Sequence, residues 1–292
     1  MRILRKIFVV VLVLTAILLA GSRFWHRIND KNVQSYEGSV SGNNIDYTGH
    51  ILQSSLLRIN SFQISGKPTA AITSHHLPTA ENFIHSMYAG LKSQNPDIQT
   101  FIIVGPDHFE QCGSLITMTK KNFLTPGGEL ENNLSLGEYL ESFGVSQEDG
   151  CFKNEHSIGV QTTFIKTYFP NASVSAILFS SAASQAEATR LGADLAGKYP
   201  SAVVICSTDF SHYQTVQKAN VIDEKTEKQL RGGQAGLFEL EQVDSPASLA
   251  FTVAFAKARH SKLGYLVHAN SYDFVGIPDN TTGYFNAVYT TQ

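Results

Sequence analysis

The sequence has few of the features that mark nucleic-acid-binding, repetitive or fibrous proteins. Only 16% of its 292 residues are charged, the formal net charge is -3, and no run of lysine or arginine is long enough to follow a phosphate backbone. No internal repeat and no low-complexity tract is present. With 42% hydrophobic residues, the chain can bury a sizeable core. We therefore exclude global disorder and a coiled coil, and we expect no nucleic-acid partner.

Cysteine and several catalytic motifs are also scarce. Cys112, Cys151 and Cys206 are an odd number without CxxC spacing, so the sequence indicates neither a disulfide framework nor a structural zinc knuckle. Cys206 lies in an apolar run and is expected to be a small buried residue, with access to a functional site as the alternative. A complete phosphate-binding loop and a G-x-S-x-G motif are absent, which leaves nucleophilic serine catalysis with little support.

The N-terminus carries the pattern of an export signal. Arg2, Arg5 and Lys6 precede an uncharged apolar run over residues 7–20. This order predicts a signal peptide or signal anchor within residues 1–28, and a buried core helix is the alternative. The positive flank would keep the N-terminus in the cytoplasm. We therefore expect a membrane-anchored protein with an extracytoplasmic domain, or a secreted one if the signal is cleaved.

The remaining chain reads as a linker over residues 29–46 and a single domain over residues 47–292. The linker is rich in Asn, Ser and Gly, whereas apolar β-rich runs alternate with helical patterns in the domain. Strands are predicted at residues 69–73, 100–104, 115–119, 174–179, 202–206, 264–268 and 285–290, and helices at residues 80–93, 158–168 and 185–198. The alternation predicts an α/β fold with a central, mostly parallel sheet flanked by helices, and the last strand is placed at its edge.

Histidines follow several of the predicted strands. His75 and His76 end one apolar run, His108 follows a second, and His212 follows a third. Ligands of open α/β sheets bind outside the carboxyl ends of the strands, so distant histidines can meet at one rim. Imidazole suits iron, copper and zinc, and catalytic metal sites commonly keep three protein ligands and an open position. Each histidine taken alone is more simply a solvated or hydrogen-bonding side chain.

Acidic residues accompany these histidines. Asp107, Glu155 and Asp209 could each accept a ring N–H and fix the tautomer of a metal-bound histidine, or they could cap helices. His156 opens a predicted helix, where the positive end of the helix dipole disfavours its protonation. A neutral His156 could serve as a metal ligand or as a general base.

Five segments in order carry a resemblance to a known family. They read AITSHH, FIIVGPDHF, NEHSIGVQTTFI, CSTDFSHY and VDSPASL. Together they resemble the Memo family, which includes the bacterial proteins called AmmeMemoRadiSam system protein B. The resemblance implies a fold akin to the catalytic subunit of class III extradiol dioxygenases, whose non-haem iron lies at a rim of histidines.

The resemblance also implies a set of metal ligands. The family's first metal-site histidine falls on His76 and its second on His108. Animal members take a further ligand from a cysteine in a late CGRHP motif, and the position matched by order is Asp244, for which a helix cap before Pro246 is the alternative. Two histidines and one carboxylate form the arrangement of non-haem Fe(II) oxygenases, so iron is favoured, with copper or zinc as alternatives.

The histidine of the family's EHS motif falls on His156, and the aspartate and histidine of its SDFCH motif fall on Asp209 and His212. These three residues would move protons or orient a ligand in a metal-dependent oxidoreductase. A non-catalytic module that binds a small molecule or peptide, and a zinc-assisted hydrolase, are the alternative functions. The residues indicate no particular substrate.

Overall fold

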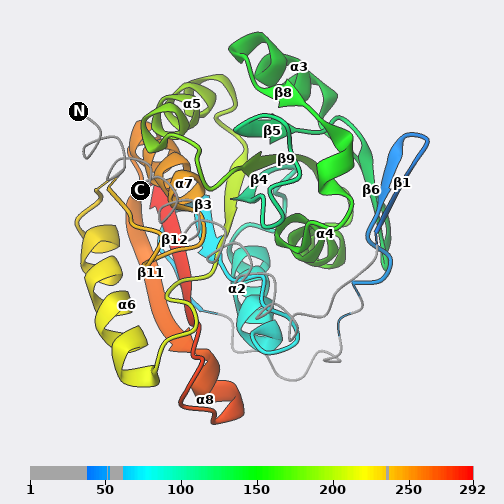
Figure 1. The fold of residues 1–292 in the computed structure, drawn as a ribbon. Helices are drawn as coiled ribbons and strands as arrows, with labels where there is room; N and C mark the ends of the chain where they lie inside the picture. Colours follow the sequence, from blue (N-terminus) through cyan, green and yellow to red (C-terminus); the bar gives the residue numbers. More distant parts are fainter. Residues whose placement is uncertain (1–37, 51, 53–61, 235–236, 292) are drawn as a thin grey trace, which may run out of the picture. The chain divides into compact units, whose positions relative to one another are not determined.

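The structure is a computed structural model that describes residues 38–50, 52, 62–234 and 237–291 (Figure 1). Its strands are β1 (Ser39–Ser41), β2 (Asn44–Asp46), β3 (Lys67–Thr73), β4 (Thr100–Pro106), β5 (Ile116–Met118), β6 (Asn122–Thr125), β7 (Gly128–Leu130), β8 (Ser146–Gln147), β9 (Ser173–Phe179), β10 (Val203–Ser207), β11 (Lys262–Asn270) and β12 (Gly283–Thr291). Its helices are α2 (Glu81–Gln94), α3 (Leu134–Phe143), η2 (Asp149–Phe152), α4 (His156–Tyr168), α5 (Gln185–Lys198), α6 (Val216–Arg231), α7 (Pro246–Ala258) and α8 (Ser271–Val275).

An eight-stranded sheet forms the centre of the fold. Its strand order is β11-β12-β3-β10-β4-β9-β5-β8. The inner strands β3, β10, β4 and β9 are parallel, whereas β12 pairs with β3 and β5 pairs with β9 in the antiparallel direction. The predicted α/β fold with a central, mostly parallel sheet flanked by helices is therefore confirmed.

Helices cover both faces of this sheet (Figure 1). Side chains alternate between the faces along β4, as a strand requires, so that Phe101 and Ile103 belong to one apolar core and Ile102 and Val104 to the other. The first core includes α2 and α4, and the second includes α5 and α7. Strands buried on both faces need to be apolar at nearly every position, which is why β4 and β10 read as continuous hydrophobic runs.

Two predicted features of the chain are corrected. Residues 39–46 are not linker, because β1 and β2 form a hairpin that joins β6 and β7 in a second, four-stranded sheet. The short strands contain few apolar residues, so they resemble a linker in sequence. The last strand, β12, is not at the sheet edge, because β11 pairs with its outer side.

The predicted signal peptide or signal anchor, residues 1–28, lies outside the described part of the chain. Residues 1–37 contain the whole predicted signal peptide or anchor. Among the residues that the structure does describe, no helix combines the length and the apolar character needed to cross a membrane.

The structure contains a disulfide that the cysteine spacing did not indicate. Cys112 and Cys151 are bonded to each other, and Cys206 is a buried free thiol in β10. The bonded cysteines are 39 residues apart, and only the fold brings the loop after β4 against η2. Burial raises the pKa of the Cys206 thiol, which agrees with its expected role as a small core residue.

Candidate metal centre

Metal-ligating side chains meet at the carboxyl ends of the central parallel strands. His75 follows β3, His108 follows β4 and Asp209 follows β10, while His156 begins α4 and Asp244 precedes α7. Two overlapping groups among the described residues could hold a metal ion. They are His75 with His108 and His156, and His75 with Asp209 and Asp244. Of the histidines expected to meet at the strand ends, His75 and His108 therefore do so, whereas His212 belongs to neither group.

The hydrogen bonds around His75 fix its tautomer. The Ser207 hydroxyl donates its one hydrogen to the Ser157 carbonyl at 2.6 Å, and its oxygen accepts from the Gln161 amide at 3.0 Å. The Nδ1 atom of His75 lies 3.2 Å from the same hydroxyl oxygen. Because that hydroxyl has no second hydrogen to give, Nδ1 is the donor and carries a proton. The other nitrogen, Nε2, then faces the centre of the cluster.

Glu155 orients His108 in the same way. Its Oε1 atom lies 2.7 Å from Nδ1 of His108, and its Oε2 atom accepts from the His108 backbone amide at 2.9 Å. Glu155 also caps α4 by accepting from the Ser157 amide. It therefore fulfils both roles that the sequence left open, and it leaves Nε2 of His108 to face Asp244.

Asp244 lies where the two Nε2 atoms converge. Its Oδ2 atom is 3.3 Å from Nε2 of His75 and 3.7 Å from Nε2 of His108. The carboxylate is oriented by the Thr208 hydroxyl, which donates to Oδ1, and by the Asp209 amide, which donates to Oδ2. The cap of α7 is Ser245, whose hydroxyl accepts from the Ser248 amide. The alternative role of Asp244 as a helix cap is therefore not observed.

The acidic groups and the histidines of this cluster stabilise each other's charged forms. Burial alone would lower the pKa of His75 and His108, but Asp209 and Asp244 raise the pKa of His75, and Glu155 and Asp244 raise that of His108 well above its usual value. Burial would raise the pKa of Asp244, yet hydrogen bonds from both histidines hold it well below its usual range. The acidic side chains thus make the space between the two Nε2 atoms favourable for a positive charge.

His156 and His212 differ from these two histidines because they are held neutral. Burial, followed by the charges of His108 and His75, lowers the pKa of His156 well below its usual value. Burial also lowers the pKa of His212. The His156 ring stacks on that of His108 with centroids 4.1 Å apart. The expected neutrality of His156 thus arises mainly from burial and neighbouring histidines rather than from the helix dipole alone.

His76 contacts the side chain of Tyr284. Its Nδ1 atom lies 2.6 Å from the Tyr284 hydroxyl, and its ring makes an edge contact with the Tyr284 ring. Neither group of metal-ligating side chains in the described part of the chain includes His76. Consecutive residues leave the strand end in different directions, and it is His75 that turns inward. The position assigned to His76 from the family resemblance is therefore taken by His75 in this geometry.

The remaining predicted acidic residues have distinct roles. Asp209 lies within the cluster, with Oδ2 3.7 Å from Nε2 of His75 and Oδ1 accepting from the Ser74 hydroxyl at 2.5 Å. Asp107 instead closes a turn by accepting from the backbone amides of Gln111 and Cys112, so it does not support a histidine ring. Sequence reasoning missed Ser207, although its place at the end of β10 is the same signal that marked the histidines.

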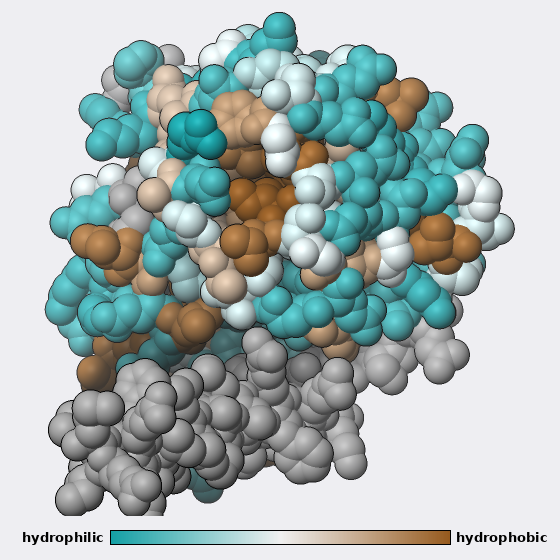
Figure 2. Space-filling view, turned by 45° about the horizontal axis from the view of Figure 1, so that its top comes forward, coloured by the Kyte–Doolittle hydropathy of each residue, from teal (hydrophilic) through white to brown (hydrophobic). Residues whose placement is uncertain are grey.

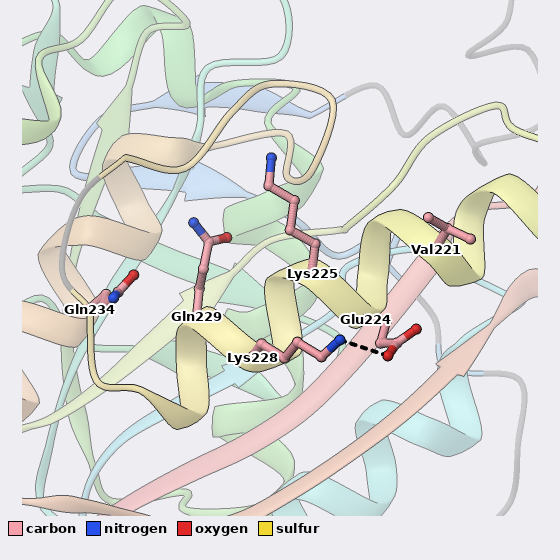
Figure 3. A pocket seen from close by; sticks show the side chains of 6 residues that line it. All are labelled: Val221, Glu224, Lys225, Lys228, Gln229 and Gln234. Atoms are coloured by element: carbon pink, nitrogen blue, oxygen red, sulfur yellow. Dashed lines mark hydrogen bonds and ion pairs between the residues drawn. The ribbon is translucent and has the colours of Figure 1, made fainter.

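Two hollows on the surface lie apart from this cluster. The larger, of about 470 Å³, contains the Glu224–Lys228 ion pair (Figure 3) and is lined by Val221, Glu224, Lys225, Lys228, Gln229 and Gln234. The second, of about 220 Å³, lies among β5, α3 and α5. Figure 2 shows apolar residues within a hollow on the side of the molecule where these elements lie. Neither hollow is lined by a residue of the histidine cluster.

Comparisons with known proteins identify the family of this chain. The family model described as Memo-like protein matches residues 78–288. MEMO1 family protein PAE0818 of Pyrobaculum aerophilum is 31% identical over 223 residues, which cover 71% of this chain and 76% of that protein. A MEMO1 family protein of Methanosarcina mazei is 30% identical over 203 residues, covering 65% and 74% of the two chains. A solved structure, uncharacterized protein JW3007 from Escherichia coli K12, gives a TM-score of 0.45 at 12% identity and covers 76% of this chain and 100% of that one. The chain belongs to the Memo-like protein family.

Proposed function

We propose that this protein is a metal-dependent oxidoreductase in which His75, His108 and Asp244 hold Fe(II). The observation that carries the proposal is the convergence of two Nε2 atoms on one carboxylate oxygen, at 3.3 and 3.7 Å. Two histidines and a carboxylate with open positions are the ligand set of non-haem Fe(II) oxygenases. The resemblance of the motifs to a family with a dioxygenase-like fold points to the same chemistry.

The donor set fits a divalent transition metal. Ligands about 2.1 Å from one ion lie about 3.0–3.4 Å from one another, close to the 3.3 and 3.7 Å between Oδ2 of Asp244 and the two Nε2 atoms. Each proposed ligand also has the supporting contact that metal-bound groups need: Ser207 for His75, Glu155 for His108 and Thr208 for Asp244. A bound ion would supply a redox centre and a positive charge that polarises a coordinated ligand.

The other residues of the cluster suit proton handling and ligand orientation. His156 and His212 are neutral at physiological pH because their pKa values are lowered, so each can accept a proton from a bound molecule. Asp209 remains beside His75 and holds the loop after β3 through Ser74. Phe109 is 39% exposed and lies against the His156 ring at 6.2 Å between centroids, so it offers an apolar contact at the mouth of the site.

We place the domain outside the cytoplasm, either anchored by the N-terminal segment or secreted after its removal. The apolar run at residues 7–20 with its basic flank supports export. The Cys112–Cys151 disulfide supports it independently, because disulfides persist in oxidising compartments and are rare in the cytosol. Protease accessibility in intact cells, with mass analysis of the mature N-terminus, distinguishes the anchored form, the secreted form and a cytoplasmic one.

Elemental analysis of the full chain tests the metal assignment. The protein is purified without chelator or affinity metal and compared with the His75→Ala/His108→Ala variant. Near-stoichiometric iron in the parent and its loss in a folded variant would support the oxidoreductase. Stoichiometric zinc would favour a hydrolase instead. A protein that retains no metal after reconstitution would contradict the proposal and leave a binding module for a small molecule or peptide as the better account.

A further inference from the structure

The Cys112–Cys151 disulfide joins the two loops that carry much of the candidate centre. Cys112 follows His108 by four residues, in the loop after β4. Cys151 precedes Glu155 by four residues, in the turn that leads into α4. The bond between them therefore closes a ring through the His108–Glu155 hydrogen bond.

Rigid turns connect each sulfur to the site. On one side, the Asp107 carboxylate accepts from the amides of Gln111 and Cys112 at 3.2 and 2.9 Å, so a compact turn encloses His108. On the other side, the amide of Glu155 donates to the carbonyl of Phe152 at 3.2 Å. Because only a few hydrogen-bonded residues separate them, a displacement of Cys112 would also move His108, and a displacement of Cys151 would also move Glu155.

Non-covalent contacts also join the two loops, among them the stacking of the His108 ring on that of His156 at 4.1 Å. The Gly113 amide donates to Oε2 of Glu148 at 2.6 Å, and Glu155 accepts from both the amide and Nδ1 of His108. Between the histidine and the cysteine, the Phe109 ring lies 6.2 Å from that of His156, and Glu110 accepts from the Ser180 hydroxyl and the Ser181 amide, which ties this loop to the end of β9. The disulfide is the covalent restraint among these contacts, so it limits how far the loop that carries His108 can move from the segment that carries Glu155.

We infer that Cys112 and Cys151 are positioning residues of the metal centre, and that their disulfide makes tight metal binding conditional on oxidation of the protein. The inference rests on the proposed metal site and adds a requirement to it. With the bond formed, Glu155 holds His108 in the tautomer and direction that a metal needs. With two thiols, the loops separate more readily and His108 loses its preorganised place. After export, a disulfide oxidant would take two electrons from the Cys112 and Cys151 thiols by thiol–disulfide exchange, with release of two protons, and the protein would then bind its metal tightly outside the cytoplasm.

The test compares metal affinity in the full chain and in the Cys112→Ser/Cys151→Ser variant, with Co²⁺ as the probe because its visible spectrum reports the coordination. We expect the variant to bind Co²⁺ about tenfold to a hundredfold more weakly, as for other losses of support around metal ligands. We also expect its spectrum to change. Circular dichroism shows whether the variant is folded, and Ser184→Ala, which removes the cap of α5, serves as the control for a general loss of stability.

The Glu148→Gln variant keeps the disulfide but weakens the Gly113 contact, so it probes the same pair of loops if the double variant fails to fold. A smaller loss of Co²⁺ affinity than in the double variant, with an unchanged melting temperature, supports the positioning role. Equal affinity and equal spectra in the parent, the double variant and Glu148→Gln would overturn the inference while leaving the metal site intact. No Co²⁺ binding by the oxidised parent would overturn the metal site itself, and the inference with it.

Discussion

The Nε2 atom of His75 lies 3.3 Å from Oδ2 of Asp244, although the two residues are far apart in the sequence. The end of β3 supplies the histidine, and the segment before α7 supplies the carboxylate. Neither residue is free to turn away, because Ser207 contacts Nδ1 of His75 and Thr208 donates to Asp244. A pair that is oriented in this manner and placed at a strand end is typical of a preorganised ligand pair.

Two adjacent histidines allow a direct test of the ligand assignment. His75→Ala removes a nitrogen that faces Asp244 and should lower metal affinity by at least about a hundredfold, as expected for loss of one of three ligands. His76→Ala removes the contact with Tyr284 and should leave affinity within about threefold of the parent. Isothermal titration with Zn²⁺ or Co²⁺ measures both. Loss of binding in the His76 variant with retention in the His75 variant would restore the assignment made from sequence.

Replacing Glu155 tests whether metal binding depends on the residue that orients the ligand His108. In Glu155→Gln the amide oxygen can still accept from the Ser157 amide, so the helix keeps its cap. The variant loses the charge that holds His108, and metal affinity should fall about tenfold to a hundredfold. The Ser184→Ala variant loses a helix cap that is distant from the site. Its folding stability should fall by about 1 kcal/mol, but it should bind metal normally. Unchanged affinity in Glu155→Gln would show that His108 needs no such partner.

Metal binding should weaken as the pH falls. The pKa values of His75 and His108 are raised, by Asp209 and Asp244 in the first case and by Glu155 in the second. Protons therefore compete for the Nε2 atoms at a higher pH than on ordinary imidazoles, and a metal must displace them. Between about pH 6 and pH 8 the affinity should rise at least about tenfold per pH unit, while one or more protons are released. Titrations in buffers of different protonation enthalpy count those protons, and an affinity independent of pH would contradict the ligand set.

Most of the fold was predictable because its central strands are covered on both faces. The runs around β4, β9 and β10 are apolar at successive positions, and the helices between them carry caps such as Ser184. The small sheet was missed because β1 and β2 have three residues each and a composition typical of loops. Short strands of this kind are stabilised by their partners rather than by their own sequence.

The site was predictable in outline but not in detail. Strand ends located the histidines, and the order of the family motifs pointed to Asp244. The choice between His75 and His76 depends on which of two identical side chains turns inward, and that direction is a property of the backbone after β3. The disulfide likewise depends on the approach of two distant loops. Both are set by tertiary structure, which the spacing of residues does not report.

Replacing Asp244 by cysteine tests the choice of metal. Animal members of the family carry a cysteine at the position matched by order, and thiolates favour copper and zinc over iron. Asp244→Cys should therefore raise the ratio of Zn²⁺ to Fe²⁺ affinity by at least about tenfold. Asp244→Asn is the matched control, because it removes the charge without adding a thiolate and should weaken both metals. Competitive dialysis under nitrogen followed by elemental analysis gives the ratio, and an unchanged ratio in the cysteine variant would indicate that Asp244 is not a ligand.

A pair of glycines in α5 tests how closely this helix packs against α7. A Cβ atom added at Gly192 would lie 2.3 Å from the carbonyl oxygen of Phe251 in α7, whereas one added at Gly197 meets nothing within 4 Å. Alanine favours a helix over glycine by about 1 kcal/mol, so Gly197→Ala should stabilise the protein by about 0.5–1 kcal/mol. Gly192→Ala gains the same helix propensity but forces α5 away from α7, and should cost about 1–3 kcal/mol overall. Urea denaturation followed by circular dichroism measures both changes. If both variants were stabilised equally, the close approach of the two helices at Gly192 would be wrong.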